Sequence, residues 1–537
     1  LTSNNVLGDN PATDIVSIAS AGNATLKNTV RTTLGTSYVT GNLVLTVDVT
    51  ADPGANPVLA QAAGASLVVG KIATLSATYT HDPGSGPVSD PANVTLGNSV
   101  NNFGTVVVAD GKDVSLRDVN AIVLGASAAD GALTVIAGGQ ISQKGALSVA
   151  GDAAFNAGSN NIVLKTAANA FGGAVAVAGR NVTLRADGGL DLGASTVSGN
   201  LDVVVTGGDL TDSGQVSVTG KATVKAESVE LDGIDDIGGG IAGGDKFNQL
   251  AVTTTDVGGS NAIKDVGGGI VFAKSSIKGD LEVESTGGAI TQNDSIVVSG
   301  VATFTADNNP GGSPTHWYDV TLANAKNNFG TVHVLSAKSV SLADTNSIVL
   351  GNLTLDDTDG PANLVVTARS SVTQNAGDAA DVPGTTTIVA GRSSSIALAG
   401  TGNTFAGAVS LSARDVTFTN SSDTVFDTVT AAGNLTVVSG EITQKTGGGA
   451  MVVGRTAGFT TSGGDVTLDN AHNDFFVVGF SGTGAVTLTD ANAVALGTST
   501  IGGDLLVTAG KSISQTGGLT VGDFHATFIA GPTSKDT

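Results

Sequence analysis

The sequence predicts an all-β protein, a parallel β-helix (β-solenoid) with three strands in each coil. Three observations predict it. One repeat recurs along the chain, and within it apolar residues alternate over short runs between Gly, Asn, Asp and Ser. In addition, no convincing 3.6-residue periodicity continues long enough for a helix. Because one coil cannot bury its inward side chains alone, stacking of coils supplies the continuous core.

The repeat opens with a Gly-x-Leu type motif, such as "GALTVIA" or "GDLLVTA", and successive copies are 68 to 90 residues apart. Shortly after most openers comes "ISQ", "ITQ" or "VTQ", while the third copy has "LTD". We expect the recurring glutamine to lie at a corner of the coil and to hydrogen-bond backbone groups or stacked neighbours. The openers begin near Leu43, Leu133, Leu201, Leu281, Leu364, Leu435 and Leu505, and the expected corner ladder is Gln143, Gln292, Gln374, Gln444 and Gln515.

A second landmark, Asn-x-Phe, precedes the openers and ends at Phe103, Phe171, Phe329, Phe405 and Phe475. Between the first two of these phenylalanines we count about nine short strands. Three strands per coil then give about 23 residues per coil and about 23 coils in the chain, stacked at the spacing of parallel strands.

This pattern predicts one continuous solenoid rather than several domains. Residues 1–40 form its start or a cap, residues 41–531 its body of about seven repeats, and residues 532–537 a tail. Two segments interrupt the repeat, namely the acidic, glycine-rich residues 227–268 and residues 306–318.

Composition restricts the functions that the chain can have. Lys and Arg number 24 against 47 Asp and Glu, a formal charge of −23, which repels phosphate backbones and disfavours nucleic acid as a partner. The chain has no cysteine for thiolate metal ligands or a cysteine nucleophile. It also has no apolar run long enough for a membrane span, and we expect no signal peptide within these residues. We expect neither membrane insertion nor a cofactor or metal.

The interruptions are the places where binding is expected, because loops on a rigid scaffold carry most contacts. Residues 306–318 hold the sole tryptophan, Trp317, between His316 and Tyr318. These three side chains predict a tip that stacks on sugars or docks a partner. The alternative is a loop folded onto the solenoid. Pro-, Gly- and Asp-containing loops are also expected at 51–63 and 82–91.

Catalysis has little support in the sequence. Asp235 and Asp236 resemble the paired carboxylates of β-helical polysaccharide hydrolases, but none of the five histidines is near them in sequence. A solvated acidic turn explains them better. "GGGIAGG" at 238–244 lacks the Lys-Ser/Thr ending of a phosphate-binding loop. We therefore predict that the chain is not an enzyme and name no catalytic residue.

The recurring Asp-x-Asn motif has two interpretations, calcium ligation or an Asx-turn between strands. Calcium-binding repeats place their ligands at short fixed intervals, whereas this motif occurs once in about 70 residues or more. The spacing favours the Asx-turn. The motif occurs at Asp118/Asn120, Asp344/Asn346 and Asp490/Asn492.

The repeats carry a family likeness. "GDLLVTAGKSISQTGGLTVGDFHATF" (503–528) and "NNFGTVVVADGKDVSLRDVNAIVLG" (101–125) resemble the repeat arrays of filamentous haemagglutinin-type, two-partner-secreted bacterial exoproteins. The resemblance implies a right-handed coil and an extracellular or cell-surface location. That family's secretion domain carries Asn-Pro-Asn type motifs, and only "GDNPATD" (8–14) occurs here, so we expect the signal and secretion domain to lie outside this chain.

On this basis we expect a bacterial structural and adhesive rod, an adhesin stalk. Its partner would be a glycan or protein on a host or neighbouring cell, or other copies of the chain. The alternative is a self-assembling subunit of an extracellular filament or surface layer, since open coil ends expose unpaired backbone groups. A β-helical polysaccharide-active enzyme is the weaker alternative.

Overall fold

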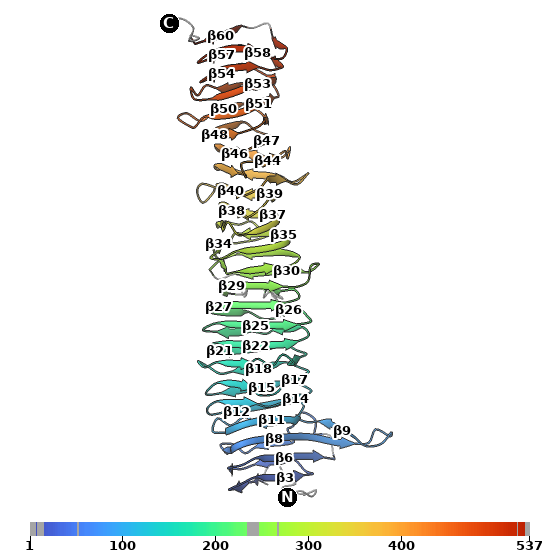
Figure 1. The fold of residues 1–537 in the computed structure, drawn as a ribbon. Helices are drawn as coiled ribbons and strands as arrows, with labels where there is room; N and C mark the ends of the chain where they lie inside the picture. Colours follow the sequence, from blue (N-terminus) through green and yellow to red (C-terminus); the bar gives the residue numbers. More distant parts are fainter. Residues whose placement is uncertain are drawn as a thin grey trace. The chain divides into compact units, whose positions relative to one another are not determined.

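The structure is a computed structural model that describes residues 7, 15–50, 53–232, 246–265, 268–522 and 525–531. It divides into two compact units, Leu1–Gly267 and Gly268–Thr537. The described residues contain strands and turns and no helix, so nothing in them is a helix that could span a membrane. Within each unit, short strands of successive turns are stacked on one another (Figure 1). The predicted parallel β-solenoid is confirmed, with about 24 turns where about 23 were expected.

The N-terminal unit consists of short strands, few of them longer than seven residues. They are β1 (Ile15–Val16), β2 (Ala19–Ser20), β3 (Ala24–Asn28), β4 (Thr32–Leu34), β5 (Ser37–Val39), β6 (Leu43–Val49), β7 (Leu59–Gln61), β8 (Leu67–His81), β9 (Val88–Pro91), β10 (Val94–Leu96), β11 (Asn102–Asp110), β12 (Val114–Asp118), β13 (Ile122–Leu124), β14 (Ser127–Ala129), β15 (Leu133–Ala137), β16 (Ile141–Gln143), β17 (Leu147–Val149), β18 (Ala153–Asn156), β19 (Ile162–Leu164), β20 (Ala170–Phe171), β21 (Val175–Gly179), β22 (Val182–Asp187), β23 (Leu190–Leu192), β24 (Ser195–Val197), β25 (Leu201–Thr206), β26 (Leu210–Asp212), β27 (Val216–Ala226), β28 (Glu230–Leu231), β29 (Lys246–Thr254) and β30 (Ser260–Asp265).

The C-terminal unit is built in the same way. Its strands are β31 (Ile270–Phe272), β32 (Ser275–Ile277), β33 (Asp280–Ser285), β34 (Ile290–Gln292), β35 (Ile296–Ala306), β36 (Val320–Leu322), β37 (Asn328–Ala337), β38 (Val340–Asp344), β39 (Ile348–Leu355), β40 (Leu364–Ala368), β41 (Val372–Gln374), β42 (Ala380–Val382), β43 (Thr386–Val389), β44 (Ser395–Leu398), β45 (Thr404–Phe405), β46 (Val409–Ala413), β47 (Asp415–Thr419), β48 (Thr424–Ala431), β49 (Leu435–Ser439), β50 (Ile442–Gln444), β51 (Met451–Thr461), β52 (Val466–Leu468), β53 (Asp474–Thr483), β54 (Val486–Asp490), β55 (Val494–Leu496), β56 (Ser499–Ile501), β57 (Leu505–Ala509), β58 (Ile513–Gln515), β59 (Leu519–Val521) and β60 (Ala526–Ala530).

Three parallel strands make one coil, and each pairs with its equivalent in the next coil. In the N-terminal unit one column runs β12–β15–β18–β21 and a second runs β13–β16–β19–β22. The third is β14–β17–β20. Because the register is in phase, an inward side chain lies over an inward side chain in every turn, as in β6, where alternate residues are buried.

Phenylalanines form recurring steps in the core. The Asn-x-Phe phenylalanines are buried, and three of them pack edge-to-face on another buried phenylalanine that comes earlier in the chain. Interplanar angles of 80–87° and centroid distances of 6.2–6.4 Å are typical of favourable aromatic pairs. The pairs are Phe155–Phe171, Phe304–Phe329 and Phe459–Phe475.

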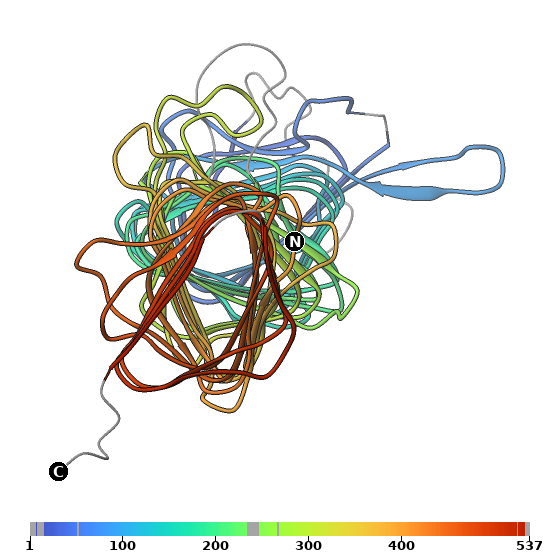
Figure 2. The same cartoon turned by 90° about the horizontal axis from the view of Figure 1, so that it is seen from above.

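One antiparallel hairpin leaves the N-terminal unit. Strand β9 pairs with the end of β8, from Thr78↔Pro91 to His81↔Val88, and the hairpin extends well beyond the coils of its unit (Figures 1 and 2). The sequence predicts a loop over 82–91, whereas the structure has a strand from Val88. The tight turn is closed by Asp82, whose Oδ1 accepts the N–H groups of Gly84 and Gly86, and both glycines have positive φ.

Candidate functional site

The recurring glutamines end their strands and pair with buried asparagines. Gln143 Nε2 donates to the carbonyl of Gly145 at 2.7 Å and to Asn169 Oδ1 at 2.8 Å. In return, Asn169 Nδ2 donates to Gln143 Oε1 at 3.0 Å. Asn169 is the asparagine of the Asn-x-Phe landmark, so the two sequence motifs form one reciprocal amide pair between neighbouring turns.

The same pair recurs through both units. In each case the asparagine comes from an Asn-x-Phe motif and is completely buried. The pairs are Gln61–Asn101, Gln292–Asn327, Gln374–Asn403 and Gln444–Asn473. Gln515 donates to the carbonyl of Gly517 at 2.7 Å. The pairing of these glutamines with the asparagines was not predicted from the sequence, although the constant order of Gln and Asn-x-Phe along the chain was a signal for it.

Backbone groups complete the hydrogen bonding of each buried asparagine. Asn169 Oδ1 accepts the N–H of Leu147 at 2.9 Å, and Asn169 Nδ2 donates to the carbonyl of Arg185 at 3.0 Å. A buried amide with an unmade hydrogen bond is costly, so these contacts explain why asparagine is needed there. The pair holds adjacent turns together and offers no free group for chemistry.

The Asp-x-Asn motif is an Asx-turn, as predicted. Asp118 Oδ1 accepts the N–H of Asn120 at 2.8 Å, and Asp118 Oδ2 accepts the N–H of Phe103 in the preceding turn at 2.6 Å. Asp344 and Asp490 make the same two contacts. The carboxylate oxygens are therefore occupied by backbone donors, and the described residues contain no group of acids and histidines suited to hold a metal.

Burial has an electrostatic consequence for these aspartates. Each is only 2% exposed, and desolvation raises the pKa of the Asp118, Asp344 and Asp490 carboxyls despite their backbone hydrogen bonds. Gln, Asn-x-Phe and Asp thus form one motif over three successive turns, here called the buried polar seam. In the first copy it consists of Gln61, Asn101 and Asp118.

A second ladder of Asp and Asn side chains follows an outer corner. Asp113 Oδ1 accepts the N–H of Ala132 in the next turn at 3.0 Å, and Asp415 binds Asn434 in the same way at 2.8 Å. A Cβ on Gly131 would collide with Asp113 Oδ1. At this opener, glycine therefore avoids a clash with a side chain from the turn before it, whereas the opener at Leu364 has Ala362 at this place.

The candidate contact residues His316, Trp317 and Tyr318 lie on an excursion tied back onto its own unit. Trp317 forms an antiparallel bridge with Asp307, and its N–H donates to Asp359 Oδ2 at 3.1 Å. His316 Nδ1 lies 3.3 Å from the same oxygen. His316 is exposed, whereas Trp317 and Tyr318 are half-buried. The backbone hydrogen bond from Trp317 is the main cause of the lowered pKa of Asp359.

Other expected features lie partly or wholly outside the described residues. Asp235, Asp236 and the "GGGIAGG" segment (238–244) are not described. Of the expected excursion 227–268, residues 246–254 form β29 and 260–265 form β30. The residues "KFNQLAVTT" of β29 pair in parallel with β27 and therefore continue the coil.

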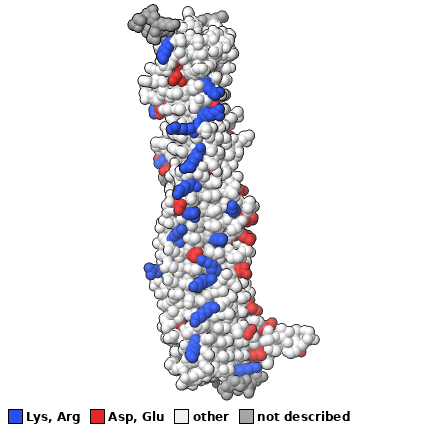
Figure 3. Space-filling view, in the orientation of Figure 1, with Lys and Arg blue, Asp and Glu red and all other residues white. Residues whose placement is uncertain are grey.

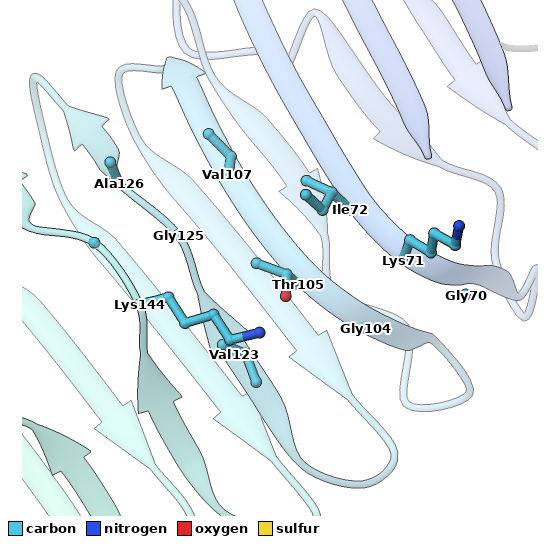
Figure 4. Close-up of a pocket in the computed structure, with 11 residues that line it drawn as sticks. Gly70, Lys71, Ile72, Gly104, Thr105, Val107, Val123, Gly125, Ala126 and Lys144 are labelled. Atoms are coloured by element: carbon cyan, nitrogen blue, oxygen red, sulfur yellow. The ribbon is translucent and has the colours of Figure 1, made fainter. Parts of the chain in front are cut away.

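The N-terminal unit also carries a groove that the sequence did not indicate. It crosses β8, β11, β13 and β16, encloses about 590 Å³ and is lined by glycines and by outward-facing side chains (Figure 4). Lys71 and Lys144 lie at its two ends. Only the pairing of strands far apart in sequence brings these residues together.

Comparison with models of protein families matches six segments to one family, described as repeats of unknown function (DUF5649). The segments are residues 111–178, 179–241, 249–336, 337–412, 413–478 and 483–534, more than half of the chain. The chain belongs to this repeat family.

Each matched segment of the DUF5649 repeats contains one of the openers from Leu133 to Leu505, so the family's repeat coincides with the repeat that the openers define. Searches of curated proteins and of solved structures found no match. Because the family's description names no function, the resemblance to filamentous haemagglutinin-type proteins stays a prediction.

Proposed function

We propose that this chain is an extracellular structural and adhesive stalk of the bacterial cell surface, of the filamentous haemagglutinin type. One observation carries the proposal: the recurring polar side chains hold turns together, whereas the sole tryptophan, Trp317, lies on an excursion between His316 and Tyr318. The side chains of the buried polar seam and of the Asp/Asn ladder at the outer corner make their hydrogen bonds to neighbouring turns of the solenoid. Contact with a partner therefore falls to excursions such as 306–318.

The excursion at 306–318 is suited to present its side chains in a defined geometry. Asp359, from a later turn, fixes the backbone of Trp317 and faces His316. Because the backbone under Trp317 is held in place, little conformational entropy of the main chain is lost on binding, which favours contact with sugars or proteins.

Binding of the purified chain to a glycan array and to cell surfaces tests the proposal. We expect Trp317→Ala to weaken binding at least about tenfold, the effect of a typical aromatic anchor. Tyr38→Ala is the matched control, because Tyr38 is 56% exposed on β5 and belongs to no excursion. Binding that survives Trp317→Ala, or is lost equally in Tyr38→Ala, contradicts the role of this excursion.

Electron microscopy tests the stalk against the alternative of a self-assembling subunit. Separate particles at all concentrations are expected for a stalk. Regular fibres that grow with concentration would instead support assembly of the filament or surface layer. Cleavage of a polysaccharide by the wild-type chain would contradict the non-enzymatic proposal altogether.

A further inference from the structure

The groove on the N-terminal unit is open because glycines replace outward side chains along its floor. Three residues occupy equivalent positions in successive turns. They are Val107 in β11, Gly125 directly after β13 and Lys144 directly after β16. A Cβ at Gly125 would collide with the Val107 side chain, so this position stays bare. The remaining floor consists of small or apolar groups such as Thr105 and Val123.

Two lysines border this floor. Lys144 reaches across the groove over Val123, while Lys71 lies at the opposite end beside Gly70 (Figure 4). Both are exposed, and neither has an ion-pair partner in the part of the chain that the structure describes. Their charges are therefore available to a ligand in the groove.

The positive charge continues beyond the groove along the same column of strands. Lys165 directly follows β19 and lies in register with Lys144, and Arg185 lies in register with Lys165 in the turn after that. Together with Lys225, these residues are called the lysine column. Arg185 pairs with Val204, which pairs with Lys225. Since adjacent strands are about 4.8 Å apart, Lys144 and Lys165 are about 5 Å apart, and Lys225 lies about 14 Å beyond Lys165 with Arg185 between them. In the lower part of Figure 3, which holds this unit, basic side chains follow one another along one face and acidic ones lie mainly at its edge.

The members of this lysine column differ in their availability. Arg185 binds Asp202 Oδ2 at 2.6 Å, so its charge is largely compensated inside the protein. Lys144, Lys165 and Lys225 are exposed and have no such partner among the described residues. Lys71 and these three lysines are therefore exposed cations without an ion-pair partner in the part of the chain that the structure describes.

The net charge of the chain and the lining of the groove indicate which kind of negatively charged polymer could bind there. A net charge of −23 opposes duplex nucleic acid or a second copy, both of which bring many charges close to the acidic remainder of the surface. A thin chain lying on the column feels mainly the local lysines, because charges more than about 8 Å away are screened at physiological salt. Single-stranded nucleic acid needs aromatic stacking platforms, and the groove is lined by no aromatic side chain.

We propose that the groove and the lysine column bind an extended acidic polysaccharide, with carboxylate or sulfate groups on the lysines and sugar rings over the glycine-lined floor. The groove and the lysine column share no residue with the excursion at 306–318. Failure of the adhesive role proposed above would therefore not contradict polysaccharide binding in the groove.

Biosensor binding of the full chain to immobilised polygalacturonate, dextran sulfate and neutral dextran tests this. Binding to one or both acidic polymers and none to neutral dextran is expected, and the two acidic polymers distinguish carboxylate from sulfate as the preferred group. We expect Lys71→Gln/Lys144→Gln to weaken binding about three- to tenfold, as exposed ion pairs do, and added salt to weaken it further.

Lys112→Gln/Lys511→Gln is the matched control, because it removes the same charge from two exposed lysines outside the groove and the column. Equal loss in this control, unchanged binding in the groove variant, or equal binding of neutral dextran would overturn the proposal. Tighter binding of duplex DNA than of either acidic polymer would also overturn it. Circular dichroism confirms that each variant is folded.

Discussion

Single amide side chains in this protein serve the purpose that backbone groups serve in a sheet, since they connect one turn to the next. Asn169 illustrates this, because its side chain bonds Gln143, the N–H of Leu147 and the carbonyl of Arg185. These contacts cross three neighbouring turns. The residue is therefore placed by its hydrogen bonds, and no reactive role is needed to explain its recurrence.

Removing one member of an amide pair should be costly. Gln143→Ala leaves part of the buried Asn169 side chain without a partner, so we expect the free energy of unfolding to fall by about 1–3 kcal/mol. Faster hydrogen exchange at the N–H of Leu147, which Asn169 accepts, would locate the loss. Gln515→Ala is the control, since Gln515 is exposed and donates to Gly517. Equal effects of the two changes would contradict the role of the pair.

The buried aspartates of the seam predict a pH dependence. Burial raises the folded-state pKa of Asp118, Asp344 and Asp490 above the unfolded value of 3.8, so the folded chain binds more protons between the two values. Their contribution to stability is fully present below pH 3.8 and is lost as pH rises through the folded pKa.

Replacing all three by asparagine should remove this dependence. Asn420 occupies the equivalent place in another repeat, and its Oδ1 accepts the N–H of Phe405 at 3.0 Å, so the amide is compatible with the fold. We expect the triple variant to gain stability relative to wild type as pH rises above 3.8, measured by urea unfolding at several pH values. A constant difference between the two proteins across this range would contradict the prediction.

At the level of the strands and their connections, the residue type at the corner before an opener depends on the side chain that packs there from the preceding turn. Asp113 and Gly131 belong to successive turns, and the side-chain oxygen of the first occupies the space that a Cβ of the second would need. The same oxygen accepts the N–H of Ala132. Glycine therefore recurs at this corner for a steric reason and not only for its conformational freedom.

A double-mutant cycle tests this coupling. Gly131→Ala should cost about 1–3 kcal/mol through overpacking, and much less in an Asp113→Ala background, where the colliding oxygen is absent. Thermal unfolding of the two single variants and the double variant measures the coupling. Strictly additive effects would mean that Gly131 is needed for another reason.

For the molecule as a whole, repetition makes stability a sum over neighbouring turns. A turn contacts mainly the turns before and after it, so one complete repeat is dispensable provided that equivalent positions are joined. The openers at Leu435 and Leu505 are equivalent and 70 residues apart. Removing residues 435–504 joins Asn434 to Leu505 and preserves the motif "GNL" in which a turn begins.

We expect this deletion to leave a folded β-protein with a cooperative thermal transition close to that of wild type. Deletion of residues 445–504 is the control. It joins Gln444, at the end of β50, to Leu505, at the start of β57, so the strands that follow no longer lie over their equivalents in the preceding turn. Circular dichroism and thermal melting compare the two. Unfolding of the opener-to-opener deletion would show that the repeats are not interchangeable.

How much of the structure could be predicted differs between local and long-range features. Alternation in β6 and turn residues around Asp118 depend on neighbours in sequence, so the strands and the Asx-turn could be predicted. Strand β9 lies in the segment 82–91, which was expected as a loop because it is short and contains proline. The groove joins Lys71 to Lys144, and only the register of four strands brings them together.

The sequence by itself determined the repeat, the stacked parallel strands and the composition of the core, because side-chain alternation and turn propensity act over a few residues. Tertiary structure alone decided that the recurring glutamines and the Asn-x-Phe asparagines form one hydrogen-bonded seam and that Trp317 is held by Asp359. It also decided that the lysines form a column on one face. These relations depend on which residues are superposed in successive turns, and loops of different length make that superposition invisible along the chain.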